Sequence, residues 1–168
     1  MKPVRMFAQT MEEIRRHAVA MYPEECCGFL VAPSSEASSG SSRHIRRVQP
    51  IENGFDGLRT RRFVIRSEDL LKFERSLEST DESVVGFYHS HPDHPARPSE
   101  YDRDHAWPWY TYVVISVTKG RAGDARAFEL DEQSREFHVA PLEVVENGRP
   151  GSEAGASERV STPGARRL

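Results

Sequence analysis

Cysteine is scarce in this chain, and its placement excludes two common uses. The 168 residues contain only Cys26 and Cys27, which are adjacent. Neighbouring cysteines are poor candidates for an ordinary structural disulfide with each other. They also do not form the C-x-x-C spacing that holds many metals. We therefore expect a reducing environment and a cytoplasmic location.

Long apolar runs and a strong excess of charge are also missing. No segment approaches the roughly 18 apolar residues of a membrane span, and M-K-P-V-R-M-F-A-Q-T at the N-terminus lacks the apolar core of a signal peptide. The formal net charge of −3 gives no electrostatic reason to expect nucleic acid or an anionic membrane as partner. Short basic clusters occur at 43–47 and 59–62. Such clusters are typical of a solvated face, with a patch for an acidic protein partner as the alternative.

The composition that remains is that of one globular domain. Hydrophobic residues make up 37% of the chain and charged residues 29%, and 168 residues suffice for a core without covalent staples. We expect this domain over residues 1–146, with a flexible Ser-rich loop at 33–42. Almost nothing in residues 147–168 could be buried, so the sequence predicts a disordered C-terminal tail.

Periodicity and capping signals predict three helices. The first spans about 10–21, with Thr10 as N-cap and Glu13 completing a capping box. The second begins after Ser67 as N-cap and turns four apolar side chains inward: Leu70, Leu71, Phe73 and Leu77. The third is short, from about Ser99 to His105. Strands are expected at 28–32, 44–48, 62–66, 84–88, 110–117, 125–130 and 136–140, the last two paired as a hairpin. The sum is a mixed α/β sheet with two main helices.

The stretch G-F-Y-H-S-H-P-D-H-P-A-R-P-S-E-Y-D, residues 86–102, carries the densest chemistry. His89 and His91 are two residues apart at a strand end, so their side chains can point to the same side. Each could offer a neutral nitrogen to one ion, and Asp102 is the best-placed third ligand. Two histidines and one carboxylate leave an open position, as in catalytic zinc sites. The alternative is a polar turn, in which the histidines only cap and solvate the backbone.

The segment S-E-Y-D, residues 99–102, has a structural interpretation of its own. Ser99 as N-cap and Asp102 at the third helical position form an S-x-x-D capping box. The two interpretations are compatible, because a capped first turn would hold Asp102 toward the histidines. His94 lies between prolines and is expected to be exposed. Asp104 and His105 fall on other faces of the short helix and are expected to take no part.

These segments together resemble a known family. E-C-C-G-F-L, then H-S-H-P, then S-E-Y-D, in this order and spacing, resemble the JAMM (MPN+) metalloproteases. Seven residues separate His91 from Ser99 and two separate Ser99 from Asp102, as in the motif of that family. Glu25 is the glutamate that fits the E-x-C-G-like strand start, and Glu24 is its neighbour. The resemblance covers about residues 10–140 and is to the single-domain bacterial branch.

The resemblance implies a fold, a cofactor and a role for each matching residue. The implied fold is of the α+β type within the α/β class. It has a mixed, largely antiparallel sheet flanked by two main helices, a short helix at the metal site and a cytidine-deaminase-like architecture. His89, His91 and Asp102 would hold one Zn²⁺ per chain. Glu25 would act as general base and then general acid, and Ser99 would stabilise the oxyanion. Cys26 and Cys27 would pack beside Glu25 as small buried hydrophobes.

The resemblance also implies a class of substrate. Relatives cleave amides at ubiquitin-like proteins, and the bacterial branch is associated with sulfur carriers that end in Gly-Gly. Release of cysteine from such a carrier is one activity of this kind. The carrier tail could add as a strand at an exposed sheet edge, flanked by 52–61 and 92–98. A non-catalytic scaffold of the same fold is the alternative function. The motif does not indicate the oligomeric state.

Overall fold

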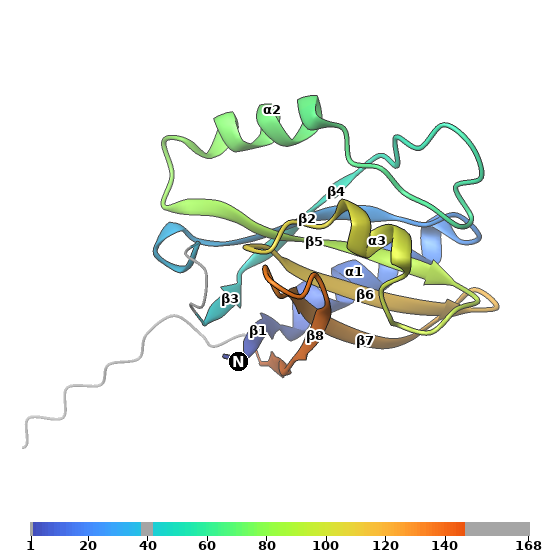
Figure 1. The fold of residues 1–168 in the computed structure, drawn as a ribbon. Helices are drawn as coiled ribbons and strands as arrows, with labels where there is room; N and C mark the ends of the chain where they lie inside the picture. Colours follow the sequence, from blue (N-terminus) through green and yellow to red (C-terminus); the bar gives the residue numbers. More distant parts are fainter. Residues whose placement is uncertain (1, 38–41, 147–168) are drawn as a thin grey trace, which may run out of the picture.

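A six-stranded sheet forms the centre of the computed structural model, which describes residues 2–37 and 42–146 (Figure 1). Within these residues the strand order is β4-β2-β5-β6-β7-β8. In this sheet only β5 and β6 pair in parallel, so the expected mixed, largely antiparallel sheet is confirmed. The strands are β2 (Cys27–Pro33), β4 (Arg47–Ile51), β5 (Glu82–Pro92), β6 (Thr111–Thr118), β7 (Arg121–Leu130) and β8 (Phe137–Ala140). The predicted disordered tail, 147–168, lies outside the described residues.

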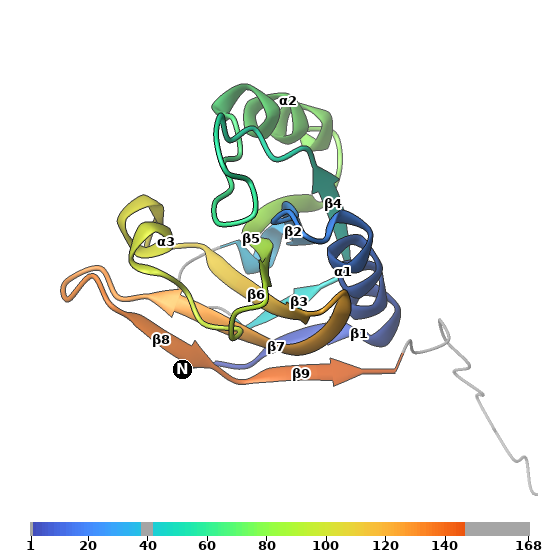
Figure 2. The same cartoon turned by 90° about the vertical axis from the view of Figure 1, so that its right-hand side faces the viewer.

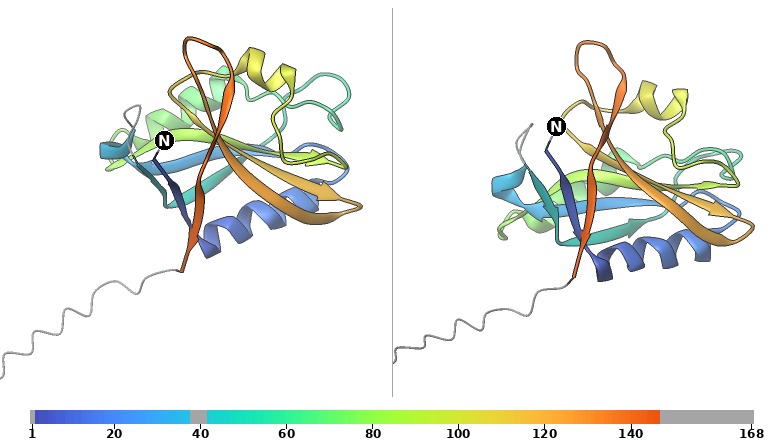
Figure 3. Two further views of the ribbon diagram at one scale, coloured as in Figure 1. Left: turned by 60° about the horizontal axis from the view of Figure 1, so that its bottom comes forward. Right: turned by 90° about the horizontal axis from the view of Figure 1, so that it is seen from below.

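A second, three-stranded parallel sheet lies beside the first. Its order is β3 (Arg43–Ile45), β1 (Val4–Phe7) and β9 (Leu142–Val145). Pro141 stands between β8 and β9, and the chain passes there from one sheet into the other, as the view from below shows (Figure 3). The sequence analysis missed both β1 and β9. Each has four residues, too few to show a clear period without the partner strand.

One helix covers each face of the six-stranded sheet (Figure 2). On one face, α1 (Ala8–Met21) buries Ile14 and Ala18 in a cluster that includes Leu30 and Ile115. On the other face, α2 (Ser67–Leu77) packs Phe73 on Phe29, with ring centroids 5.1 Å apart. Burial of these apolar faces holds the two helices on the sheet.

Three details of the predicted helices are wrong. Helix α1 begins at Ala8, so Thr10 is not its N-cap; the buried Thr10 hydroxyl donates to the main-chain oxygen of Arg46. Arg66, and not Ser67, caps α2. Leu71 is 49% exposed and does not face inward. For Thr10 the long-range hydrogen bond to Arg46 replaces the local capping role that the sequence suggested.

Two of the predicted strands are also corrected. The strand expected at 44–48 divides at Arg46 into β3 and β4, which belong to different sheets. Residues 62–66, all described, do not form a strand. The backbone N–H of Val64 donates to the side chain of Asn53, and its oxygen accepts from Gly54. These bonds replace the regular ladder of a strand. The hairpin of β7 and β8 is confirmed, while residues 34–36 of the expected Ser-rich loop form a short 3₁₀ helix.

Among the described residues, no helix has both the length and the apolar character needed to cross a bilayer.

The contact between Gly86 and Thr111 gives a test of the β5–β6 pairing. A Cβ atom at Gly86 would lie 1.9 Å from the main-chain oxygen of Thr111, and backbone cannot move aside as a side chain does. We expect Gly86→Ala to lower the free energy of unfolding by about 3 kcal/mol, the upper range for overpacking. The measurement is a urea titration at constant m-value. Gly54→Ala is the control, because the three atoms nearest to its added Cβ belong to the side chain of Arg66, which can move more readily than backbone; equal midpoints for the two variants would contradict the prediction.

Candidate metal centre

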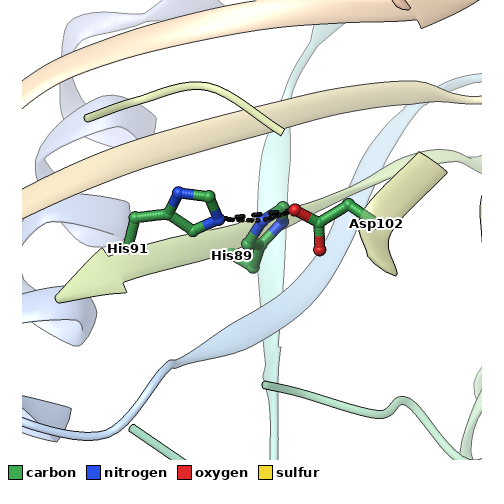
Figure 4. A group of neighbouring side chains, drawn as sticks. All are labelled: His89, His91 and Asp102. Atoms are coloured by element: carbon green, nitrogen blue, oxygen red, sulfur yellow. Dashed lines mark hydrogen bonds and ion pairs between the residues drawn. The ribbon is translucent and has the colours of Figure 1, made fainter. Parts of the chain in front are cut away.

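Two histidines and one aspartate converge at the end of β5 (Figure 4). His89 and His91 lie on the same side of β5, and Asp102 comes from α3 (Glu100–His105). The two imidazole Nε2 atoms are 3.1 Å apart. Each Nε2 lies 3.4 Å from Oδ2 of Asp102. The arrangement expected from the H-x-H spacing is therefore present, with all three side chains almost fully buried.

These distances fit a shared cation. Ligands at about 2.0–2.1 Å from a tetrahedral ion lie about 3.3 Å from one another, close to the separations observed. His91 Nδ1 lies 3.0 Å from the main-chain oxygen of Pro95. Because a carbonyl oxygen can only accept, this nitrogen carries the proton and His91 Nε2 presents a lone pair. His89 Nε2, His91 Nε2 and the Asp102 carboxylate face one another at these distances, a donor set that fits a divalent metal ion.

Protonation of the three side chains follows from burial and from their mutual contacts. Burial lowers the pKa of His89, which favours the neutral form that binds metals. Burial acts in the same direction on His91, but its hydrogen bond and charge interaction with Asp102 outweigh it and raise the pKa of His91. For Asp102, burial alone would raise the pKa. The interactions with both histidines and with Ser99 outweigh burial and hold the pKa of Asp102 well below its usual value.

A capping box fixes Asp102, as the S-x-x-D spacing predicted. Ser99 is the N-cap of α3, and its Oγ accepts from the backbone N–H of Asp102 at 3.1 Å. In return, Asp102 Oδ2 accepts from the Ser99 backbone N–H at 2.6 Å and from its hydroxyl at 2.8 Å. The oxygen that faces the histidines is thus the oxygen that the helix cap holds. The conformation that caps the helix is also the one that turns Asp102 toward the histidines.

Glu25 is buried just before β2, in the wall of the same site. Cys27, two residues later, pairs with His89 across β2 and β5. The backbone N–H of Glu25 donates to the main-chain oxygen of Arg59 at 2.7 Å, and its own oxygen accepts from Asn53 Nδ2 at 3.0 Å. Burial raises the pKa of the Glu25 carboxyl to about 8; Asp102 also raises it, while His91 and Arg62 oppose the change. A carboxyl so perturbed beside a candidate metal site is typical of a functional group.

The remaining predicted residues lie where the sequence placed them. Cys26 and Cys27 are free and buried; burial raises the pKa of Cys26 to about 11 and that of Cys27 to about 12, so both stay thiols at neutral pH. His94 is exposed. His105 lies in the wall of a neighbouring pocket, but neither it nor Asp104 belongs to the convergent group.

The centre lies between two pockets of opposite character. His89 and Asp102 border a pocket of about 250 Å³ whose walls are largely apolar, including Phe63, Ile65, Leu70, Phe87, Trp107 and Phe137. Glu25, His91 and Ser99 border a second hollow of about 640 Å³ with a basic wall of Arg61, Arg62, His94 and Arg97. A substrate bound across the centre would therefore meet apolar surface on one side and positive charge on the other.

The sequence analysis missed three residues that shape the site. Asn53 is 2% exposed. Its amide nitrogen donates to the main-chain oxygens of Glu25 and Arg62, and its oxygen accepts from two backbone N–H groups. Phe63 stacks on the ring of His89 at 4.4 Å, and Tyr101 carries the guanidinium of Arg62 at 4.3 Å from its ring centroid. The asparagine in the loop I-E-N-G was the available signal, although turn residues of this type are common.

Residues 7–131 match the family model described as prokaryotic homologs of the JAB domain. The chain belongs to this family. The JAMM (MPN+) resemblance is thereby confirmed. The chain is 31% identical over 107 residues to the desampylase of Haloferax volcanii, covering 63% of this chain and 72% of the relative. It is 33% identical over 131 residues to the CysO-cysteine peptidase of Mycobacterium tuberculosis, covering 77% and 83%.

A solved structure supports the fold assignment. A JAB1/MPN domain protein from Archaeoglobus fulgidus superposes with a TM-score of 0.53 at 18% identity, over 86% of this chain and 100% of that one. At this level of identity the likeness concerns the fold alone.

Burial of Glu25 predicts a pH-dependent stability in metal-free protein. Its pKa rises from 4.5 in the unfolded chain to about 8 in the folded one. The stabilisation is complete below pH 4.5 and declines as the pH rises to about 8, since only the unfolded chain releases the proton across that window. We expect the stability of the wild type relative to Glu25→Gln to fall from pH 5 to pH 8, by at most about 1.4 kcal/mol per pH unit. Urea unfolding with a chelator measures this difference; parallel pH curves for the two proteins would contradict it.

Proposed function

We propose that this protein is a zinc-dependent peptidase that hydrolyses an amide at the C-terminal Gly-Gly end of a ubiquitin-like or sulfur-carrier protein. The observation that carries the proposal is the convergence of His89, His91 and Asp102 at 3.1–3.4 Å, with buried Glu25 in the wall of the same site. Family membership and the peptidase names of the relatives support it. We also propose a cytoplasmic location, in keeping with the two free thiols.

Zn²⁺ is the proposed metal because two imidazoles and one carboxylate with an open position are typical of catalytic zinc. His89 Nε2, His91 Nε2 and Asp102 Oδ2 would hold it. When bound, the ion would supply an acidified water and polarise the scissile carbonyl.

Glu25 is the proposed proton carrier. Its burial makes the carboxylate a stronger base than an exposed glutamate. Glu25 takes one proton from the attacking water, whose oxygen bonds to the carbonyl carbon. It then gives the proton to the leaving nitrogen as the C–N bond breaks. The products are a carrier with a free carboxylate and a free amine.

Ser99 is the proposed donor to the carbonyl oxygen as negative charge develops there. In the structure its hydroxyl donates to Asp102 Oδ2 at 2.8 Å. Ser99 is exposed and borders the basic pocket, so a rotation of the hydroxyl directs it toward a substrate. The carrier tail would reach the site from a sheet edge. Within the described residues, the edges of the six-stranded sheet are β4 and β8.

Metal analysis tests the cofactor. We expect about one zinc per chain in the wild type, from the three-ligand pattern. His89→Ala and Asp102→Ala should lose the metal, because each removes a ligand. Glu25→Gln should retain it, because Glu25 is outside the convergent group. Zinc content by mass spectrometry gives the result, and a wild type that binds no zinc would favour the non-catalytic scaffold.

Cleavage of defined conjugates tests the reaction. Gly-Gly-ended carriers that bear a C-terminal adduct would be incubated with the protein and weighed by intact mass spectrometry. We expect Glu25→Gln to reduce the rate by about 10²–10⁴-fold, the usual contribution of general acid–base catalysis. Glu24→Gln is the matched control and should stay within about two-fold of the wild type, because this neighbour does not border the site. Equal turnover by Glu25→Gln would exclude the mechanism.

A further inference from the structure

Among the described residues, three arginines in the wall of the basic pocket form no ion pair within 4.0 Å. Arg61, Arg62 and Arg97 are exposed and border the same hollow as Glu25 and His91. In the part of the chain that the structure describes, the ion pairs within 4.0 Å involve other arginines. Glu100 also borders this hollow and pairs with none of the three arginines. The three arginines outnumber Glu25 and Glu100 in the wall of this pocket, although Arg62 also interacts with the charge of Glu25, so the pocket presents net positive charge.

Arg62 is held in a defined position relative to the proposed catalytic groups. Its guanidinium lies 4.3 Å from the ring centroid of Tyr101, the residue before Asp102. Its main-chain oxygen accepts from Asn53 Nδ2 at 2.9 Å, and the same nitrogen donates to Glu25 at 3.0 Å. A guanidinium stacked on a ring keeps the N–H groups at its edge free. Those groups match the two oxygens of a carboxylate.

The direction of proton transfer decides which part of a substrate meets these arginines. Glu25 gives its proton to the leaving nitrogen, so the leaving group must lie on the side of Glu25. That is the basic pocket, while the apolar pocket lies beside His89 and Asp102. In a leaving α-amino acid, the carboxylate is two bonds from the scissile nitrogen. In a leaving lysine side chain, four methylenes would occupy that place and leave the arginines unpaired.

We propose that Arg61, Arg62 and Arg97 form a carboxylate subsite that binds the free α-carboxylate of the leaving residue. The subsite makes the protein selective for a carrier with a single amino acid after the scissile amide, over a carrier joined to a lysine side chain. This inference rests on the proposed function and adds the chemical class of the leaving group to it.

A pair of substrates that differ only in one charge tests the subsite. One is a Gly-Gly-ended carrier extended by a single amino acid with a free carboxylate, and the other ends in the carboxamide. We expect the zinc-loaded wild type to prefer the acid in kcat/KM by about 10- to 100-fold, the range for hydrogen bonds to a charged group. Arg62→Gln should bring this ratio close to one, mainly through a higher KM for the acid.

Two further variants complete the design. Arg97→Gln, at a second exposed position of the pocket, should lower the same ratio. Arg121→Gln, an exposed arginine of β7 outside the pocket, should leave both substrates and the zinc content unchanged. Equal cleavage of acid and amide by the wild type would overturn the subsite and leave the proposed function intact. The subsite would also be overturned, with the proposed function intact, if the zinc-loaded Arg62→Gln variant kept the wild-type ratio of kcat/KM for acid over amide. A wild type that cleaves neither substrate, but cleaves the same carrier joined to a lysine side chain, would overturn the subsite and leave the proposed function intact. A wild type that cleaves none of the three would overturn the proposed function, and the subsite with it.

Discussion

The position of β5 between β2 and β6 is the constraint on which the site depends. Antiparallel pairing with β2 sets Cys27 opposite His89 and so brings Glu25, two residues earlier, to the histidines. Parallel pairing with β6 cannot be closed by a tight turn and needs a crossover. This crossover contains α3 and therefore delivers Asp102. Gly86 permits the close approach of Thr111 that this pairing requires.

Several polar groups at this centre are held by defined hydrogen bonds, although the buried Nδ1 of His89 has no hydrogen-bond partner among the described residues. Asp102 takes two hydrogen bonds from Ser99, and His91 is oriented by Pro95. Asn53 uses both of its amide protons to tie the backbones of Glu25 and Arg62 together. Such supports hold side chains in place before any ion or substrate arrives, which is how a site avoids reorganisation during a reaction. A bound divalent cation would supply the counter-charge for Asp102.

The two sides of the centre differ in charge, and this difference would orient a substrate in the site. The apolar walls lie beside His89 and Asp102, and the arginines lie beside Glu25 and His91. The basic cluster at 59–62 looked in the sequence like a solvated face, or a patch for an acidic partner. The fold brings Arg97 from the loop after β5 to the same hollow. The function proposed for the basic cluster depends on these two segments lying beside the same hollow, and no local sequence pattern predicts that arrangement.

The sequence by itself determined the parts whose signals are local. The alternation of His89 and His91, the capping box of Ser99 and Asp102 and the apolar runs of β2, β5 and β6 depend on residues a few positions apart. Tertiary structure decided the rest: the division of β3 from β4 at Arg46, the irregular backbone at 62–66 and the burial of Glu25. In these places the backbone forms hydrogen bonds with groups that are distant in the sequence, as Val64 does with Asn53. Local sequence patterns do not predict these bonds, because they depend on which segments become neighbours in the folded chain.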